Sequence, residues 1–379
     1  MAVIVQKYGG SSVADVEKIR GVAQRVARTR ALGKQVVVVV SAMGDTTDEL
    51  LALARKISAN PHRRELDMLL TAGERISMAL LGMALHDQGV EAVSFTGSQS
   101  GIITDGAHTN ARIHEVRPVR ILEELARGRV VIVAGYQGVS REKEITTLGR
   151  GGSDTTAVAL AAALDAEVCE ICSDVDGVFT ADPRLVPGAR RLSELSHEEM
   201  QELALAGAKV LNAQAVEFAR DRGITIHAQS TFQPGPGTRV LRQAQRELRV
   251  SGVALDAELL VVNAPEQAAL TELLAQHGAW PRELWDGRAL ISLENVHALP
   301  ALLAALRAAG IDFDEGLAQV SVVGSGLGSS PEPLQRALRA VGLPPRSVLV
   351  SPLRIALLVP REAARECVRK LHAEFLEKS

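Results

Sequence analysis

The chain has few of the residues that commonly signal special chemistry, with only three cysteines and 3% aromatic residues in 379 positions. Three cysteines do not make a disulfide framework in a chain of this size. Cys169 and Cys172 form a C-x-x-C, but they lie in an extended apolar run, where residues three apart point to opposite faces of a strand. We therefore interpret both as buried strand thiols and not as a redox or zinc pair.

The chain also lacks an excess of charge of either sign. It has 42 basic and 45 acidic residues, a formal net charge of −3, spread along the sequence. This distribution leaves no basic field that would hold nucleic acid or anionic lipid, so we expect a small-molecule partner. The start, "MAVIVQKYGG", fits neither a signal peptide nor a transit peptide, and we find no apolar run of membrane-spanning length. These absences lead us to expect a cytoplasmic protein.

The first two thirds of the chain alternate between strand and helix patterns. Two β-branched runs, "VVVVVSAMG" (36–44) and "RVVIVAGYQG" (129–138), are typical of strands buried on both faces of a parallel sheet. The segment "SSVADVEKIRGVAQRVA" has apolar residues at three- and four-residue spacing behind a serine, as in a capped amphipathic helix. The alternation predicts an α/β sandwich.

The pattern changes after "QPGPGTRVL" (233–241), which is rich in proline and glycine. We therefore divide the chain into a first domain, residues 1–245, and a C-terminal region, residues 246–379. This region contains two passes of short strands and helices that resemble a pair of ferredoxin-like modules, at about 250–316 and 317–379. The modules are either separate along the chain or intertwined.

Small and polar residues follow several of the predicted strands, in "KYGGSS", "SAMGDTTD" and "SDVDGVFTADPR". Ligands of open α/β sheets bind beyond the carboxyl ends of the strands, so these loops should converge on one ligand-binding rim. The sequence has no P-loop, and we expect any phosphate to be held at two glycine pairs, 9–10 and 151–152, each of which opens a helix. Taken singly, Glu74 would be an ordinary solvated helical residue and Asp154 a capping carboxylate.

Six segments, however, occur together and in a recognisable order: "KYGGSSV", "VVVSAMGDTTDEL", "TAGERIS", "ITTLGRGGSDTTA", "CSDVDGVFTADPR" and "GAKVL". In order and spacing they resemble the aspartate kinases of the amino-acid kinase superfamily, over residues 1 to about 245. The remaining third resembles the paired ACT domains of that family only in outline. The resemblance implies a three-layer sandwich with a mainly parallel sheet, followed by two ACT modules.

The resemblance also implies roles for individual residues. Arg150 would hold the α-carboxylate of aspartate in a bidentate pair, Glu74 would pair with its ammonium group, and Thr47 and Ser153 would hydrogen-bond the substrate. Lys7 would neutralise charge on the transferring phosphoryl group, and Asp154 would orient lysine or substrate. The implied nucleotide-binding positions are Gly9, Gly10, Ser11, Ser173, Asp174, Phe179, Arg184 and Lys209.

The implied activity is transfer of phosphate from ATP, with Mg²⁺, to the side-chain carboxylate of L-aspartate, the first step of lysine, threonine and methionine synthesis. The implied assembly is a homodimer through the C-terminal region, whose sheet edges need covering. Two alternatives remain: a kinase for another small carboxylic acid, and a catalytically inactive, ligand-sensing regulator of the same fold. Retention of the implied catalytic and substrate-binding residues argues against the regulator.

The chain departs from the family pattern in several places. Residues Asn212, Ala213 and Gln214 and the segment "AQST" (228–231) lack arginines that family members often carry near the nucleotide, which predicts an effect on ATP affinity. Glu266 and Glu332 stand where regulated ACT domains commonly have the glycine of an effector-binding turn. Added bulk and negative charge there predict weak inhibition, or none, by lysine and threonine.

Two further motifs have ordinary interpretations. The segment "VSVVGSGLGSSPE" (320–332) resembles a dinucleotide-binding turn, but it has serine at 329 where the third glycine would stand. We expect a plain strand-to-helix turn there. His227 is expected to be a hydrogen-bonded strand histidine and not a ligand.

Overall fold

The computed structural model describes residues 2–149, 151–244, 250–263, 266–285, 287–293, 296 and 299–377. They form two compact units. Unit 1 comprises Met1–Val178, Arg191–Gln201 and Lys209–Arg246, and unit 2 comprises Phe179–Arg190, Glu202–Ala208 and Glu247–Ser379. Two short segments from the first 245 residues thus belong to unit 2, and the boundary expected after residue 245 lies in a stretch outside the described residues.

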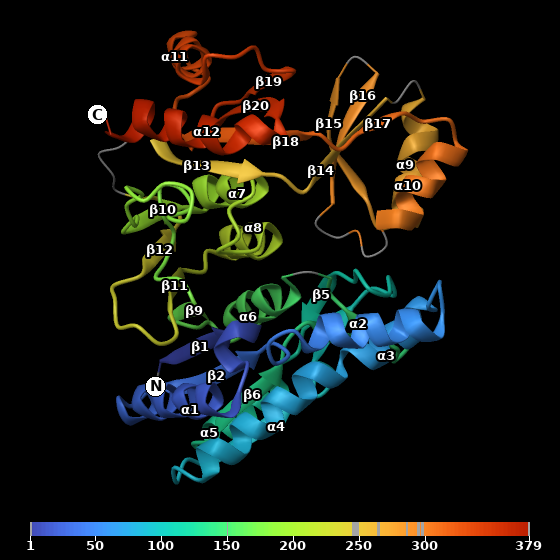
Figure 1. The fold of residues 1–379 in the computed structure, drawn as a ribbon. Coiled ribbons are helices and arrows are strands. Elements are labelled where there is room, and N and C mark those ends of the chain that lie inside the picture. Colours follow the sequence, from blue (N-terminus) through green and yellow to red (C-terminus); the bar gives the residue numbers. More distant parts are fainter. Residues whose placement is uncertain are drawn as a thin grey trace. The chain divides into compact units, whose positions relative to one another are not determined.

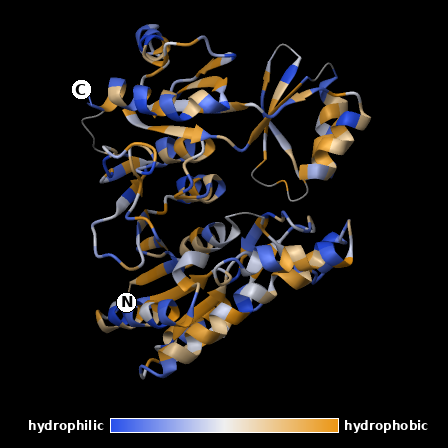
Figure 2. Cartoon of the chain, in the orientation of Figure 1, coloured by the Kyte–Doolittle hydropathy of each residue, from blue (hydrophilic) through white to orange (hydrophobic). Residues whose placement is uncertain are grey.

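Unit 1 is built on a mainly parallel eight-stranded sheet (Figure 1). Its strands, in spatial order, are β10 (Glu194–Ser196), β12 (Thr238–Leu241), β11 (Ile226–Ser230), β9 (Val168–Ser173), β1 (Val3–Tyr8), β2 (Gln35–Val40), β6 (Val130–Ala134) and β3 (Ala92–Phe95). Only the pair β11–β12 is antiparallel. The central strands are almost entirely apolar, as Figure 2 shows, because helices cover both of their faces.

Helices on the two faces of this sheet complete three layers (Figure 1). The helices α1 (Val16–Ala31) and α4 (Ala72–His86) bury their apolar stripes against one face, while α6 (Gly152–Ala163), with α8 (Ala213–Arg222) beside it, covers the other. The remaining helices that begin in unit 1 are α2 (Thr46–Ile57), α3 (Arg63–Leu70), α5 (Val119–Ala126) and α7 (His197–Leu205), together with the short 3-10 helix Gly10–Val13. The predicted α/β sandwich is confirmed.

A second, four-stranded sheet of unit 1 lies beside the carboxyl end of the large one. Its order is β5 (Ile113–Val116), β4 (Ile102–Thr104), β7 (Gln137–Ser140) and β8 (Ile145–Thr147). The loop 105–112 joins β4 to β5, and residues 148–151 connect β8 to α6. This small sheet therefore presents the segment that contains the candidate Arg150.

The helical stretch Arg63–His86 corrects one expectation, because by length and composition alone it could cross a membrane. The stretch consists of α3 and α4, joined at Thr71. Met78, Leu81 and Leu85 pack into the core beside the large sheet, and Asp67 and Glu74 are buried on the same stretch. Its apolar character is explained by this packing inside unit 1.

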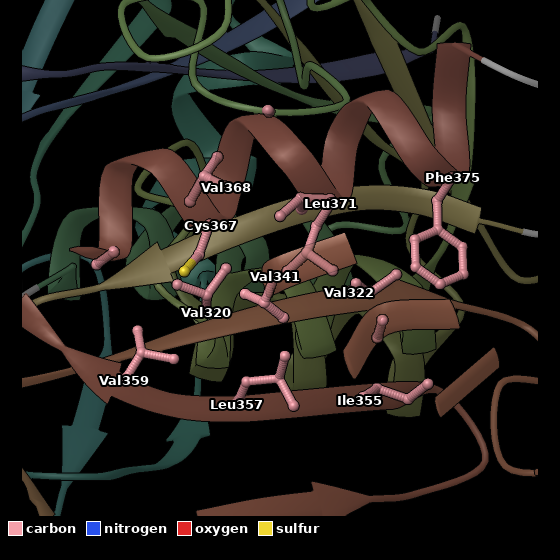
Figure 3. Close-up of a cluster of buried hydrophobic side chains, with 14 of the residues drawn as sticks. Val320, Val322, Val341, Ile355, Leu357, Val359, Cys367, Val368, Leu371 and Phe375 are labelled. Atoms are coloured by element: carbon pink, nitrogen blue, oxygen red, sulfur yellow. The ribbon is translucent and has the colours of Figure 1, made fainter. Parts of the chain in front are cut away.

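Unit 2 contains two four-stranded antiparallel sheets, each covered by helices. One has the order β13 (Val250–Asp256), β18 (Leu317–Gly324), β20 (Arg354–Pro360) and β19 (Ser347–Val350), with α11 (Glu332–Val341), α12 (Arg361–His372) and a final π-helical turn, Ala373–Glu377. Figure 3 shows its core, where α12 lays Cys367, Val368 and Leu371 over β18 and β20. The other has the order β15 (Trp280–Trp285), β16 (Arg288–Ser292), β14 (Leu259–Asn263) and β17 (Phe313–Asp314), with α9 (Gln267–Gln276) and α10 (Leu299–Ala308).

These two sheets interleave along the chain. Strand β13 precedes β14 in sequence, yet it pairs with β18 in the other sheet over Val250–Asp256. The segment "VSVVGSGLGSSPE" is the end of β18 and the turn before α11, as expected. Strand β13 pairs with β18 because its apolar residues fit the core around β18 and β20, and sequence order alone does not reveal this pairing.

Two smaller predictions concern single side chains. Cys169 and Cys172 lie on β9, buried as free thiols, and the register pairs them with Val5 and Tyr8 of β1. The Nε2 of His227 on β11 lies 2.9 Å from the carbonyl oxygen of Pro236. Both interpretations are confirmed.

Candidate active site

Lys7 and Asp154 form the centre of the candidate site. Lys7 lies near the carboxyl end of β1, between Val39 of β2 and Ile171 of β9. Asp154 lies in the first turn of α6, which begins just beyond the carboxyl ends of the strands. The Nζ of Lys7 is 2.7 Å from Oδ1 of Asp154, and the two side chains are 13% and 10% exposed. The parallel sheet thus holds an ammonium group at its ligand-binding edge, where a short ion pair fixes its position.

The loops after β1 and β2 meet beside this pair. The amide of Gly44 donates to the carbonyl oxygen of Gly10 over 3.1 Å. A Cβ on Gly10 would lie only 3.1 Å from the carbonyl oxygens of both Ala42 and Gly44, so this close approach of the two loops favours glycine there. A Cβ on Gly9 would lie 3.4 Å from Nζ of Lys7, while Ser11 is exposed at the start of the short helix. The predicted convergence is confirmed for these two of the three loops.

Glu74 is a buried acidic residue at this edge of the sheet, and its pKa is raised. It lies in the first turn of α4 and is 2% exposed. Its Oε1 accepts a hydrogen bond of 3.1 Å from the amide of Ala42, but no donor among the described residues reaches its Oε2. Burial raises the pKa of Glu74 to about 7. A buried carboxylate with one oxygen unsatisfied is suited to receive a cationic group.

Two substrate candidates lie in the first turns of helices that begin at this end of unit 1. Thr47 is half-buried in the first turn of α2, immediately after the loop that carries Ala42. The preceding residue, Thr46, approaches the start of α4, because its Cγ2 would lie 3.7 Å from a Cβ on Gly73. Ser153 opens α6, and its Oγ lies 2.8 Å from the Cβ position of Gly135 at the end of β6.

The turn that should carry the substrate-binding arginine has two glycines in the left-handed region. Gly149 has φ 76° and Gly151 has φ 71°. Arg150 itself lies outside the described residues. The side chain of Asn110 packs against Gly149, and that of Asn212 packs against Gly151, so a side chain at either glycine would be blocked as well as strained. The backbone on both sides of position 150 is thereby held in place.

The nucleotide candidates are more dispersed. Ser173 ends β9, and its Oγ accepts from the amide of Val175 over 3.3 Å, while Asp174 and Lys209 are exposed. Phe179 and Arg184 belong to unit 2. The guanidinium of Arg184 forms an ion pair of 2.7 Å with Asp182, its local neighbour. Within unit 1 the amide of Gly9 donates over 3.3 Å to the carbonyl oxygen of Cys172, so Ser173 follows directly beside the glycine loop, whereas Phe179 and Arg184 belong to the other unit.

The divergent segment after Lys209 contributes to the site directly. Asn212 caps α8 by accepting from the amides of Gln214 and Ala215 over 3.0 and 3.1 Å. Its own amide donates over 3.4 Å to Oδ2 of Asp154. Asn212 thus connects the start of α8 to the partner of Lys7, which is a structural role for a residue where the chain departs from the family pattern.

Sequence analysis missed a buried group around Asp67 on α3. The carboxylate is fully buried and contacts His108, Thr109 and Thr147. The available signal was its spacing, because Asp67 and Glu74 fall at three- and four-residue steps with the buried Leu70, Met78, Leu81 and Leu85. Acidic residues on the buried face of an amphipathic helix require partners, and so are candidates for a site.

Comparison with known proteins agrees with this geometry. The amino acid kinase family model matches residues 2–228. The aspartokinase of Mycolicibacterium smegmatis is 45% identical over 405 aligned residues, covering 99% of this chain and 96% of that protein. The aspartokinase of Thermus thermophilus is 43% identical, with 99% of both chains covered.

Solved structures are similar over the whole chain as well. The crystal structure of E. coli aspartokinase III in complex with aspartate and ADP, described as the R-state, has a TM-score of 0.84 at 25% identity, with 98% of this chain and 99% of that chain covered. The T-state of the same enzyme, in complex with lysine and aspartate, has a TM-score of 0.77. The chain therefore belongs to the amino acid kinase family. Within that family it is a member of the aspartokinases.

Proposed function

We propose that this protein transfers the γ-phosphoryl group of ATP to the side-chain carboxylate of L-aspartate, giving 4-phospho-L-aspartate and ADP. This is the first step toward lysine, threonine and methionine. The aspartokinase relatives and the neighbour with aspartate and ADP bound support the assignment. The single observation that carries it is the presence at one sheet edge of two groups suited to the two substrates: the ammonium group of Lys7, fixed by Asp154, and the half-satisfied buried carboxylate of Glu74.

In this proposal the substrate is held by charge. The ammonium group of aspartate binds Oε2 of Glu74, and the α-carboxylate binds the guanidinium of Arg150 in a bidentate pair. Thr47 and Ser153 hydrogen-bond the substrate. The buried position of Glu74 supports this arrangement, because an ammonium group would supply the donor that Oε2 otherwise lacks.

The chemistry then requires charge stabilisation more than proton transfer. The side-chain carboxylate is already ionised at neutral pH, so its oxygen attacks the γ-phosphorus directly. The bond to the β,γ-bridging oxygen breaks, and ADP leaves with that electron pair. Lys7 neutralises the charge that spreads over the transferring group, and the amides of Gly10 and Ser11 add donors, while the amide of Gly9 already donates to the carbonyl oxygen of Cys172 and holds the loop. Asp154 orients Lys7 through the 2.7 Å pair and accepts no proton.

Magnesium would supply Lewis-acid neutralisation of the phosphates. Among the described residues no three histidine, cysteine or acidic side chains form a group that would hold a metal, and Oδ1 of Asp154 is engaged by Lys7. This donor set fits an ion held mainly by phosphate oxygens and water. Ser173, Asp174, Phe179, Arg184 and Lys209 remain our proposed contacts to the nucleotide.

For residues 246–379 we propose a role in assembly. The edge strands of both sheets expose apolar side chains: Trp280 and Leu284 on β15, which are 65% and 48% exposed, and Val348 and Val350 on β19. Pairing of such edges between two chains would cover them, so we expect a homodimer acting in the cytoplasm. Inhibition by lysine and threonine should be weak or absent.

A coupled ADP-release assay tests the activity, with ATP and Mg²⁺ fixed and aspartate, glutamate and other small carboxylic acids varied. The expected result is turnover with aspartate and much slower turnover with glutamate. Turnover with another acid alone would identify a different kinase of this family. Folded protein without turnover on any of them would support the inactive regulator instead.

A further inference from the structure

The carboxylate of Asp67 binds two separate segments of unit 1. Its Oδ2 lies 2.6 Å from Nδ1 of His108, and its Oδ1 accepts over 2.6 Å from Oγ1 of Thr147. The amide of Thr109 donates to both oxygens, over 3.0 and 3.2 Å. The Asp67 side chain is completely buried, and burial raises its pKa despite these donors. Because both oxygens of this buried carboxylate are hydrogen-bonded, Asp67 holds its partner segments firmly together.

Each partner lies next to a candidate substrate contact. Asp67 is in the last turns of α3, and its own carbonyl accepts from the amide of Thr71, where α4 and its Glu74 begin. Thr147 ends β8, three residues before Arg150. Asp67 therefore joins the helix pair that carries Glu74 to the strand that leads into the arginine turn.

The loop 105–112 strengthens the same connection. The amide of Ala111 donates over 2.8 Å to the carbonyl of Thr147, and the side chain of Asn110 lies against Gly149. Thr109 is held at φ 69°, in the left-handed region that a β-branched residue rarely adopts. Such strain persists only where surrounding contacts enforce it, and here those contacts come from Asp67.

We propose that Asp67, supported by His108, is a positioning residue that holds the helix pair carrying Glu74 against the strand that leads to position 150, and so fixes the groups that bind the α-carbon end of aspartate. This inference rests on the proposed function, because it assigns the ammonium group of the substrate to Glu74 and its α-carboxylate to Arg150. Both groups are attached to the α-carbon, so the relative placement of their two partners sets the affinity for the substrate. Loosening the connection should weaken aspartate binding, while ATP binding stays as it was.

Asp67→Asn tests this directly, because it keeps the shape of the side chain but removes its charge. We expect the KM for aspartate to rise about 10- to 100-fold and the KM for ATP to change less than about threefold. Equal changes in both KM values, or none, in a folded variant would overturn the proposal.

Thr147→Val serves if Asp67→Asn does not fold, since it removes one hydroxyl donor and keeps the side-chain volume. It should raise the KM for aspartate several-fold. Thr146→Val is the matched control on the same strand: its hydroxyl pairs with that of Thr104 at 2.6 Å and does not contact Asp67, so both KM values should stay unchanged. If Thr146→Val raises the KM for aspartate as much as Thr147→Val, the effect is one of general packing and the proposal is wrong.

The two histidine variants separate hydrogen bonding from bulk. Asparagine at position 108 can donate to Asp67 and alanine cannot, so His108→Asn should retain more of the aspartate affinity than His108→Ala. Equal losses in the two variants would contradict the role of His108. A wild-type enzyme without aspartate turnover would refute the proposed function itself, whereas normal turnover with an unaffected Asp67→Asn variant would refute only the positioning role.

Discussion

The Nζ of Lys7 lies 2.7 Å from Oδ1 of Asp154, with both side chains nearly buried where strand β1 ends and helix α6 begins. The two residues are far apart in sequence and come from a strand of the parallel sheet and a helix that packs against it. The carboxylate removes the freedom of a long flexible side chain before substrate arrives. This preorganised ammonium group is the feature on which the proposed phosphoryl transfer depends most.

Replacement of Lys7 should therefore affect the chemical step. We expect Lys7→Ala to lower kcat by at least about 100-fold, with a smaller change in the KM for aspartate. Lys34→Ala is the matched control, because Lys34 pairs with Glu167 beside the opposite, amino end of β2. Steady-state kinetics with both substrates varied decides the result.

Replacement of Arg150 should give the complementary pattern. Arg150→Ala should mainly raise the KM for aspartate, since a bidentate charge pair with the α-carboxylate is lost. If Lys7→Ala raised the KM for aspartate while Arg150→Ala lowered only kcat, the roles of the two cations would have to be exchanged.

The pKa of Glu74 predicts the pH dependence of substrate binding. The ammonium group of aspartate binds the ionised carboxylate, so protonation of Glu74 competes with binding below its pKa of about 7. Affinity for aspartate should rise with pH up to about 7 and level off above it. Calorimetry in buffers of different ionisation enthalpy should detect a proton released on binding near pH 6. An affinity that is flat from pH 5.5 to 8 would show that Glu74 does not pair with the substrate.

The same burial predicts how stability changes with pH in the absence of ligand. The pKa of Glu74 is higher in the folded chain, at about 7, than the ordinary value of 4.5 that applies when unfolded. Between these values the folded state binds more protons, so the contribution of Glu74 to stability decreases as pH rises from about 4.5 to about 7. Glu74→Gln should reduce this decrease, which denaturant titrations at pH 5 and pH 8 would measure.

The thiols should be unreactive in the native protein. Burial raises the pKa of Cys172 to about 12 and that of Cys169 well above its usual range, and Cys367 is buried on the core-facing side of α12. A thiol reagent at pH 7.5 should modify none of them within minutes, and all three after unfolding in denaturant. Rapid modification of one native thiol would contradict the structural role of the C-x-x-C.

Assembly and feedback can be measured on the same preparation. Sedimentation at micromolar concentration should show a homodimer, and a monomer would refute the proposed role of β15 and β19.

Glu266 lies at the N-cap of α9 and Glu332 in the first turn of α11, so each brings a negative charge to a helix start where an effector carboxylate would otherwise bind. Lysine and threonine, alone or together, should inhibit weakly or not at all. Half-maximal inhibition at or below about millimolar concentration would contradict this interpretation.

Local sequence was sufficient for much of the fold and part of the site. The runs around β2 and β6 indicated strands buried on both faces, and the glycines after β1 indicated a turn that approaches other backbone. Such features depend on side-chain polarity and on backbone freedom, which are properties of short segments. The pairing of β13 with β18, by contrast, could not be predicted, because β13 lies beside β14 in sequence and would fit either sheet by composition.

The sequence by itself determined the layered α/β architecture, the glycine turns and the family, because periodicity, turn chemistry and ordered motifs are all carried by contiguous residues. Only the tertiary structure decided which of these residues act on one another. Glu74 has one oxygen unsatisfied because α4 packs against the loop of Ala42, and Asp67 joins α3 to Thr147, which is 80 positions away. Hydrogen bonds and desolvation depend on distances across the folded chain, so the ionisation and the partners of these carboxylates appear only once the helices are packed.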